Sequence, residues 1–171
     1  MSKMYICNSQ KFEFSSGGYV GMPMEVDGLP QSLSIEGQIL QRKSEFHVTL
    51  LSVKSIVAEH GDVEQKILDL FCNFVKENDI LFVSYTGEFR VAKTDENKTV
   101  VAMCEVSNVH VFSDLLEKVL GIEIPKQPTH VTLYALPPDV RGIALSSPKD
   151  LEQMTHVIEV PSTVKTALCL T

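Results

Sequence analysis

The chain has 171 residues, of which 44% are hydrophobic and 22% charged, a composition typical of one soluble globular domain. Its formal net charge of −7 disfavours a protein that holds long nucleic acid through phosphate contacts, although a small nucleotide bound by local donors stays compatible with it. No apolar run approaches the length of a membrane span, so we expect no membrane association.

Cysteine usage adds a further expectation. The four cysteines lie far apart, with no C-x-x-C pair and no nearby histidine, which argues against a zinc site. The N-terminus lacks the charged-then-apolar pattern of a signal peptide. We therefore interpret Cys7, Cys72, Cys104 and Cys169 as reduced thiols of a cytoplasmic protein.

The N-terminal part of the chain alternates short strand patterns with breaks. Strands are predicted at residues 4–7, 19–26 and 33–40, and residues 11–14 extend the first of these or form another. Residues 15–18 predict a turn or mobile loop, Pro23 is expected to restrict its strand to a sheet edge, and Gly37 to mark a bulge. Gly17, Gly18 and Gly21 match neither a Walker loop nor a dinucleotide fingerprint, so we interpret them as turn residues.

Two helices follow the strand predicted at residues 46–51. The first covers residues 53–60 and is closed by Gly61. The second begins at Asp62, with Gln65 three residues on as a capping box, and its apolar residues recur at helical spacing as far as Val75.

The C-terminal half repeats this mixture of strands and helices. Strands are predicted at residues 80–85, 99–106, 129–134 and 157–160, with a hairpin loop at 93–98, and residues 88–92 form another strand or the continuation of 80–85. Helices are predicted at residues 112–120 and from Ser147-Pro148, which read as N-cap and first position. Residues 141–145 fit a strand or an irregular turn. His110 fits a loop or first-turn residue at the start of its helix, and His156 fits a structural or exposed position. The order indicates an α+β fold.

The tetrapeptide His-Val-Thr-Leu occurs twice, beginning at His47 and at His130, and each copy lies in a predicted strand. Side chains alternate along a strand, so His47 shares a face with Thr49, and His130 shares one with Thr132. A single His-x-Thr is unremarkable on a half-exposed sheet. Two copies with the same neighbours indicate a paired site.

Two imidazoles on facing strands suit concerted acid–base catalysis, because histidine titrates near neutral pH. The threonine hydroxyls suit donation to the non-bridging oxygens of a phosphate at the transition state. The expected chemistry is phosphodiester transfer, in which one imidazole activates water or a ribose hydroxyl and the other protonates the leaving oxygen.

The duplicated motif resembles the signature of the 2H phosphoesterase superfamily, which is hydrophobic-His-x-Thr/Ser-hydrophobic, twice. Residues 46–50 and 129–133 match it. The resemblance implies one two-lobed domain over residues 1–171, a duplicated α+β fold with two antiparallel-rich sheets flanked by helices around a central cleft. It implies His47 and His130 as the catalytic pair and Thr49 and Thr132 as phosphate ligands. Many relatives carry a helix between the first strand and the first motif, where residues 17–37 here look loop- and strand-like.

The resemblance also implies metal-independent action, without a cofactor, on 2′,3′-cyclic phosphates, 2′–5′ linkages or cyclic oligonucleotides. Tyr134, on the face of His130, is the best residue for base stacking, ahead of Tyr19 and of Phe46, which fits the core. Arg141 is a further substrate-binding candidate, as is Arg42 beside Lys43. We expect a monomer with a small nucleotide or oligonucleotide substrate. A non-catalytic module that binds nucleotides or RNA ends on the same fold is the alternative.

Overall fold

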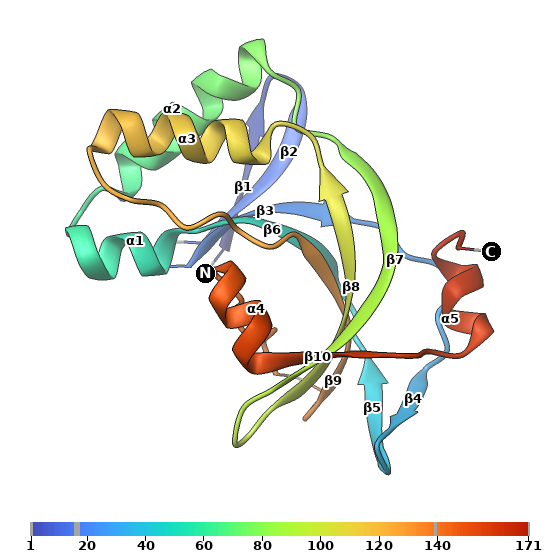
Figure 1. Cartoon of the computed structure of the whole chain (residues 1–171). Coiled ribbons are helices and arrows are strands. Elements are labelled where there is room, and N and C mark those ends of the chain that lie inside the picture. Colours follow the sequence, from blue (N-terminus) through green and yellow to red (C-terminus); the bar gives the residue numbers. More distant parts are fainter. Residues whose placement is uncertain (1, 16–17, 139, 171) are drawn as a thin grey trace.

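The computed structural model describes residues 2–15, 18–138 and 140–170 and has a mixed α+β fold (Figure 1). In this part of the chain ten antiparallel strands form one open sheet, with main order β1-β2-β3-β6-β9-β8-β7-β10 and the β4–β5 hairpin joined to β9 through β5. The strands are β1 (Ser2–Cys7), β2 (Gln10–Ser15), β3 (Tyr19–Met24), β4 (Ser32–Ile35), β5 (Gln38–Arg42), β6 (Phe46–Ser52), β7 (Phe82–Lys93), β8 (Lys98–Val106), β9 (His130–Leu136) and β10 (Thr155–Ile158). The helices are α1 (Val53–His60), α2 (Glu64–Glu77), α3 (Val109–Leu120), α4 (Pro148–Met154) and α5 (Ser162–Ala167).

The division into two sheets that the family resemblance implied is wrong for the described strands. Strand β9 pairs with β6 on one side and with β8 on the other, so the N-terminal and C-terminal strands belong to one sheet. The two motif strands therefore lie side by side as hydrogen-bonded neighbours, rather than on separate sheets facing each other.

The main core lies where helices α2 and α3 pack beside β1 and β2 (Figure 1). The Phe71 ring of α2 makes edge-to-face contacts with Phe12 of β2, at 4.8 Å between centroids, and with Phe112 of α3, at 5.2 Å. Ile67 and Val75 complete the buried stripe of α2, which confirms the predicted apolar face. Edge-to-face geometry is favourable for aromatic pairs beyond the area they bury.

Helix ends follow local signals at α1 and α4 and depart from them at α2. Helix α1 ends at Gly61, whose φ of 78° suits glycine, and the Ser147 hydroxyl accepts the Asp150 N–H at the start of α4. The capping box expected at Asp62 is wrong, because α2 begins at Glu64 without a side-chain cap. The Gln65 amide instead donates to Asp69 one turn later, at 2.9 Å.

Several strand boundaries also differ from the sequence prediction. The single strand expected at residues 33–40 is the β4–β5 hairpin, because Glu36 and Gly37 both take positive φ, at 52° and 76°, and turn the chain. Residues 88–92 take the continuation alternative, because residues 82–93 form one long β7 with an irregular register between Tyr85 and Phe89. Residues 140–146 take the irregular alternative, without helix or strand.

Two expectations concern β2 and β3. The N–H of Gly18 donates to the Ser15 carbonyl at 2.8 Å, while residues 16 and 17 of the predicted loop lie outside the described residues. Strand β3 lies between β2 and β6 rather than at an edge. The pairing of β3 with β2 ends at Gly21, so Pro23 is paired with β6 alone. Its missing N–H therefore breaks no hydrogen bond to β2.

Cys7 of β1 and Cys72 of α2 form a disulfide, so the interpretation of all four cysteines as reduced thiols is wrong for this pair. Sequence spacing gave no sign of it, because the two residues are 65 positions apart and meet only when α2 packs on β1. Cys104 and Cys169 are free. No helix in the described ranges is long and apolar enough to cross a membrane.

Candidate functional site

The register of β6 against β9 brings the two His-x-Thr segments together. Val48 pairs with Val131 in an antiparallel ladder, and both are fully buried on the core face. Their neighbours in each strand therefore point to the opposite face, where His47 lies across from Thr132 and Thr49 lies across from His130. Directly opposed Cβ atoms in such a pair are about 5 Å apart, and diagonal ones about 7 Å. The two imidazoles thus lie on one diagonal of a four-residue polar square and the two hydroxyls on the other.

His130 is the more buried of the two histidines, with 6% of its surface exposed. Burial lowers its pKa to about 4, and the nearby His47 lowers the pKa in the same direction. Its Nδ1 lies 3.1 Å from the Pro128 carbonyl, which can only accept a hydrogen bond. Nδ1 therefore carries the proton of the neutral ring, and Nε2 has a free lone pair.

His47 is half-buried, and this burial is the main cause that lowers its pKa. The carboxylates of Glu13 and Glu45 act in the opposite direction, and the Lys43 ammonium adds to the lowering. The imidazole lies flat on the ring of Tyr19 from β3, with 4.8 Å between centroids and 8° between planes. Carboxylates near His47 therefore favour its charged form, whereas no carboxylate is among the causes that shift the pKa of His130.

Residues 140–147 form a strap that follows the motif strands. At one end the Lys43 ammonium donates to the Val140 carbonyl at 2.8 Å. At the other end the Ser55 hydroxyl of α1 donates to Ser146 at 3.4 Å. Between them Gly142 approaches Thr132 so closely that a Cβ there would lie 3.1 Å from the threonine Oγ1. The strap thus borders the polar square on the β9 side.

Arg141, a predicted substrate-binding residue, lies on this strap and is exposed. Its charge lowers the pKa of Tyr19, which places it near the Tyr19–His47 stack. Arg141 also precedes Gly142, the residue of the strap that approaches Thr132. Arg42 does not lie free, because its Nη1 donates to the Leu29 carbonyl at 3.0 Å.

Tyr134 does not fit the base-stacking role expected for it. Its ring is fully buried, and its hydroxyl donates to the Pro30 carbonyl at 3.0 Å. Alternation along β9 predicted that it would share the face of His130 and Thr132. Instead both Leu133 and Tyr134 are buried, next to the irregular step between β8 and β9. Phe46 packs against the core, as expected.

Sequence reasoning missed the stack of Tyr19 on His47 and the role of Pro128. The stack depends on the pairing of β3 with β6, where Pro23 lies opposite His47 and Gly21 opposite Thr49. No local pattern reveals such a non-local register. Pro128 is different, because it lies two residues before His130, and its carbonyl could have been suspected from position alone.

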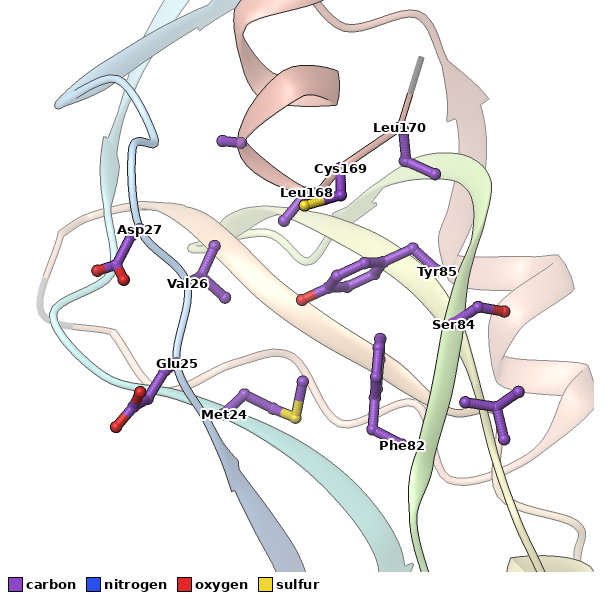
Figure 2. A pocket seen from close by; sticks show the side chains of 12 residues that line it. Met24, Glu25, Val26, Asp27, Phe82, Ser84, Tyr85, Leu168, Cys169 and Leu170 are labelled. Carbon is purple, nitrogen blue, oxygen red and sulfur yellow. The ribbon is translucent and has the colours of Figure 1, made fainter.

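A separate groove of about 470 Å³ lies away from the polar square, between the end of β3, β7 and the C-terminal segment (Figure 2). Figure 2 shows the Tyr85 ring extending into it from β7, while the carboxylates of Glu25 and Asp27 point away. None of the sequence-predicted site residues lines it. Across the described residues, no group of three or more His, Cys, Asp or Glu side chains is placed to hold a metal ion.

Comparison with known proteins found no relative of this chain. No protein-family model, no curated protein and no solved structure matches the chain. The chemistry of the polar square is therefore argued from its own residues.

Proposed function

We propose that this chain is a phosphodiesterase of the two-histidine type that needs no metal. The observation that supports the proposal is the pairing of Val48 with Val131, which places both copies of the motif on one polar face. The substrate class is a 2′,3′-cyclic phosphate, a 2′–5′ linked nucleotide or a cyclic oligonucleotide. The two-lobed, duplicated arrangement around a cleft, a monomeric state and a cytoplasmic location remain predictions alongside it.

In the proposed reaction His130 is the general base. Its Nδ1–H is engaged with Pro128, so the free lone pair of Nε2 takes the proton from a water or ribose hydroxyl. The resulting oxygen attacks phosphorus, and the bond from phosphorus to the leaving oxygen breaks. The half-buried Thr49 and Thr132 hydroxyls donate to the non-bridging oxygens, where charge builds up in the transition state.

His47 is the general acid that protonates the leaving oxygen. Its pKa is lowered in the free protein, so it has to gain a proton as the substrate binds. The negative charge of the phosphodiester favours this gain, because an opposite charge nearby raises the pKa of an imidazole. Glu13 and Glu45 act in the same direction. The proton then passes to the leaving oxygen, which balances the proton that His130 takes up.

The test is turnover of a nucleotide panel in excess chelator by the wild type, His47→Ala and His130→Ala. The panel contains 2′,3′-cyclic mononucleotides, 2′–5′ dinucleotides and 3′,5′-cyclic oligonucleotides. We expect cleavage of at least one class by the wild type and none by either variant, with circular dichroism showing that the variants are folded. Unchanged turnover in either variant contradicts the assignment. Binding without cleavage by the wild type indicates the non-catalytic alternative.

A further inference from the structure

We infer that Tyr19 is a positioning residue for His47, an inference that rests on the proposed function for its catalytic meaning. The two rings are nearly parallel, 8° apart, and their centroids lie 4.8 Å apart. One face of the imidazole is therefore covered by the phenol ring. A substrate then meets His47 at the ring edge, where the nitrogens are.

His47 needs such support more than His130 does. The Pro128 carbonyl fixes the ring of His130 through Nδ1. For His47 the structure records a ring contact instead, the stack on Tyr19. This stack can hold the plane of the imidazole. An acid whose ring rotates freely loses the alignment that proton transfer requires.

Gly21 makes room for the Tyr19 ring. A Cβ built at Gly21 would lie 2.8 Å from Cε2 of Tyr19, closer than real Cβ contacts occur. Gly21 is also paired with Thr49, so it lies directly beside the polar square on the neighbouring strand. Because Gly21 has no side chain, the Tyr19 ring can extend over it and reach His47. Any larger residue at this position pushes the ring away.

Glu13 fixes the other end of the tyrosine. Burial first, and then the nearby Glu13 carboxylate, raise the pKa of Tyr19 to about 12, so this carboxylate lies close to the phenol hydroxyl. Glu13 is paired with Gly21 across β2 and β3, so it lies on the same face of the sheet. A chain of contacts therefore runs from Glu13 through Tyr19 to His47 across three adjacent strands.

The experiment compares Tyr19→Leu, Tyr19→Phe and Gly21→Ala with a matched control, Tyr5→Leu. Tyr5 is also half-buried, but its ring packs against Phe14 instead of a histidine. The first readout is the NMR signal of the His47 ring, followed through a pH titration. The second is the separation of kcat from KM on the panel substrate that the wild type cleaves.

In Tyr19→Leu and Gly21→Ala we expect the His47 ring protons to lose the shielding of the stacked ring. Water then reaches the imidazole, so its pKa rises toward the ordinary value, because burial is the main cause that lowers it. The charged or titratable groups around His47 and its stack, which these substitutions do not replace, are Glu13, Lys43, Glu45, His130 and Arg141. We expect kcat to fall by about tenfold to 100-fold with little change in KM.

Tyr19→Phe keeps the stacked ring and loses only the hydroxyl near Glu13, so it should keep the wild-type NMR shift of His47 and most of kcat. The inference is overturned if Tyr19→Leu and Gly21→Ala leave the His47 signal and its pKa as they are in the wild type. It is also overturned if Tyr5→Leu has the same effects. The NMR readout needs no substrate, so failure of the proposed function and failure of the positioning role remain distinguishable.

Discussion

At the scale of single residues, the two histidines differ in what holds them, and this difference should appear in the pH dependence of kcat/KM. The base has to be neutral, and the burial of His130 puts its pKa at about 4. The acid has to be protonated, and the pKa of His47 is lowered as well. We expect a bell-shaped profile with its maximum below pH 6.5, since kcat/KM reports the free enzyme.

The profile of kcat should lie at higher pH than that of kcat/KM, because the bound phosphodiester favours imidazolium. Steady-state kinetics from pH 4 to 9 measure both curves. A kcat/KM maximum above pH 7, or a flat profile, contradicts the assignment of a buried base and a half-buried acid.

The burial of His130 also predicts how stability depends on pH, whether or not the protein is an enzyme. The pKa of His130 is about 4 when folded and ordinarily about 6.5, so between these values the unfolded chain binds more protons. Stability therefore rises with pH through this window and is lost as the pH falls from 6.5 toward 4. The full effect is roughly 3 kcal/mol.

Urea unfolding at several pH values between 4 and 7 tests this, with His130→Gln beside the wild type. We expect the free energy of unfolding to depend less on pH in His130→Gln, because its side chain does not titrate. The matched control is His60→Gln at the exposed end of α1, which should keep the wild-type dependence. Equal pH dependence in His130→Gln and the wild type would show that His130 is not buried as a neutral ring.

Tyr134 gives a prediction in which a substitution lowers stability and leaves activity unchanged. Tyr134→Phe removes the hydroxyl that donates to the Pro30 carbonyl and leaves that carbonyl without its partner. The expected cost is about 1 kcal/mol of unfolding free energy. Turnover should stay at the wild-type level, because the ring is fully buried and does not reach the polar square. A large loss of kcat in a folded Tyr134→Phe protein would return this residue to the substrate-binding set.

At the scale of elements, Glu36 at the tip of the β4–β5 hairpin ties three strands together. Its carboxylate pairs with Lys93 of β7, with Lys98 of β8 at 2.8 Å and with His156 of β10 at 2.6 Å. Hydrogen bonds from Lys93, Lys98 and His156, in that order, lower the pKa of Glu36 to about 2. The stabilisation is therefore present above the ordinary carboxyl pKa and is lost as the pH falls from about 4.5 toward 2.

We expect Glu36→Gln to destabilise the protein at pH 7, because Lys98, only 6% exposed, then lacks its carboxylate partner. Thermal unfolding at pH 7 and at pH 3 measures the effect, and the difference from wild type should shrink at pH 3. Glu96→Gln, an exposed position on the nearby β7–β8 turn, is the control and should be neutral. A constant difference at both pH values would mean that charge on Glu36 does not carry the effect.

The ends of helices and strands could be predicted where a local sequence signal marks them. Gly61 closing α1 and Ser147-Pro148 opening α4 each act within one helical turn, so both ends were predicted. Helix α5 has six residues, too few for a periodic pattern, and no prediction covered it. The sequence predicts a bulge at Gly37 instead of the observed Glu36–Gly37 turn, because a glycine within a strand pattern is typical of either structure.

In the candidate site, too, the sequence predicted what depends on neighbouring residues and missed what depends on strand pairing. Both histidines and both threonines were found from the repeated motif, since alternation along a strand depends only on sequence neighbours. Their meeting point depends on the pairing of β6 with β9, which residue order does not encode locally. The partners that differ most from expectation, Tyr19 and Tyr134, are those whose positions depend on neighbouring strands.

At the scale of the whole molecule, the Cys7–Cys72 disulfide joins the first strand of the sheet to α2 across 65 positions of the chain. Closing a loop of this length in the unfolded state corresponds to about 4 kcal/mol in the chain-entropy treatment. The bond lies among core residues and contains none of the residues of the polar square. We therefore expect it to affect stability and not catalysis.

The paired replacement Cys7→Ser with Cys72→Ser should lower the free energy of unfolding by about 2 to 4 kcal/mol, with kcat unchanged in the folded protein. Cys169→Ser, which removes an exposed free thiol, is the control and should be neutral. Thiol titration of the denatured, unreduced wild type decides whether the bond exists in solution. Two reactive thiols, those of Cys104 and Cys169, are expected before reduction and four after it. Four thiols before reduction would instead support the sequence-based expectation of reduced cysteines, and the unfolding free energy of the wild type should then be insensitive to reductant.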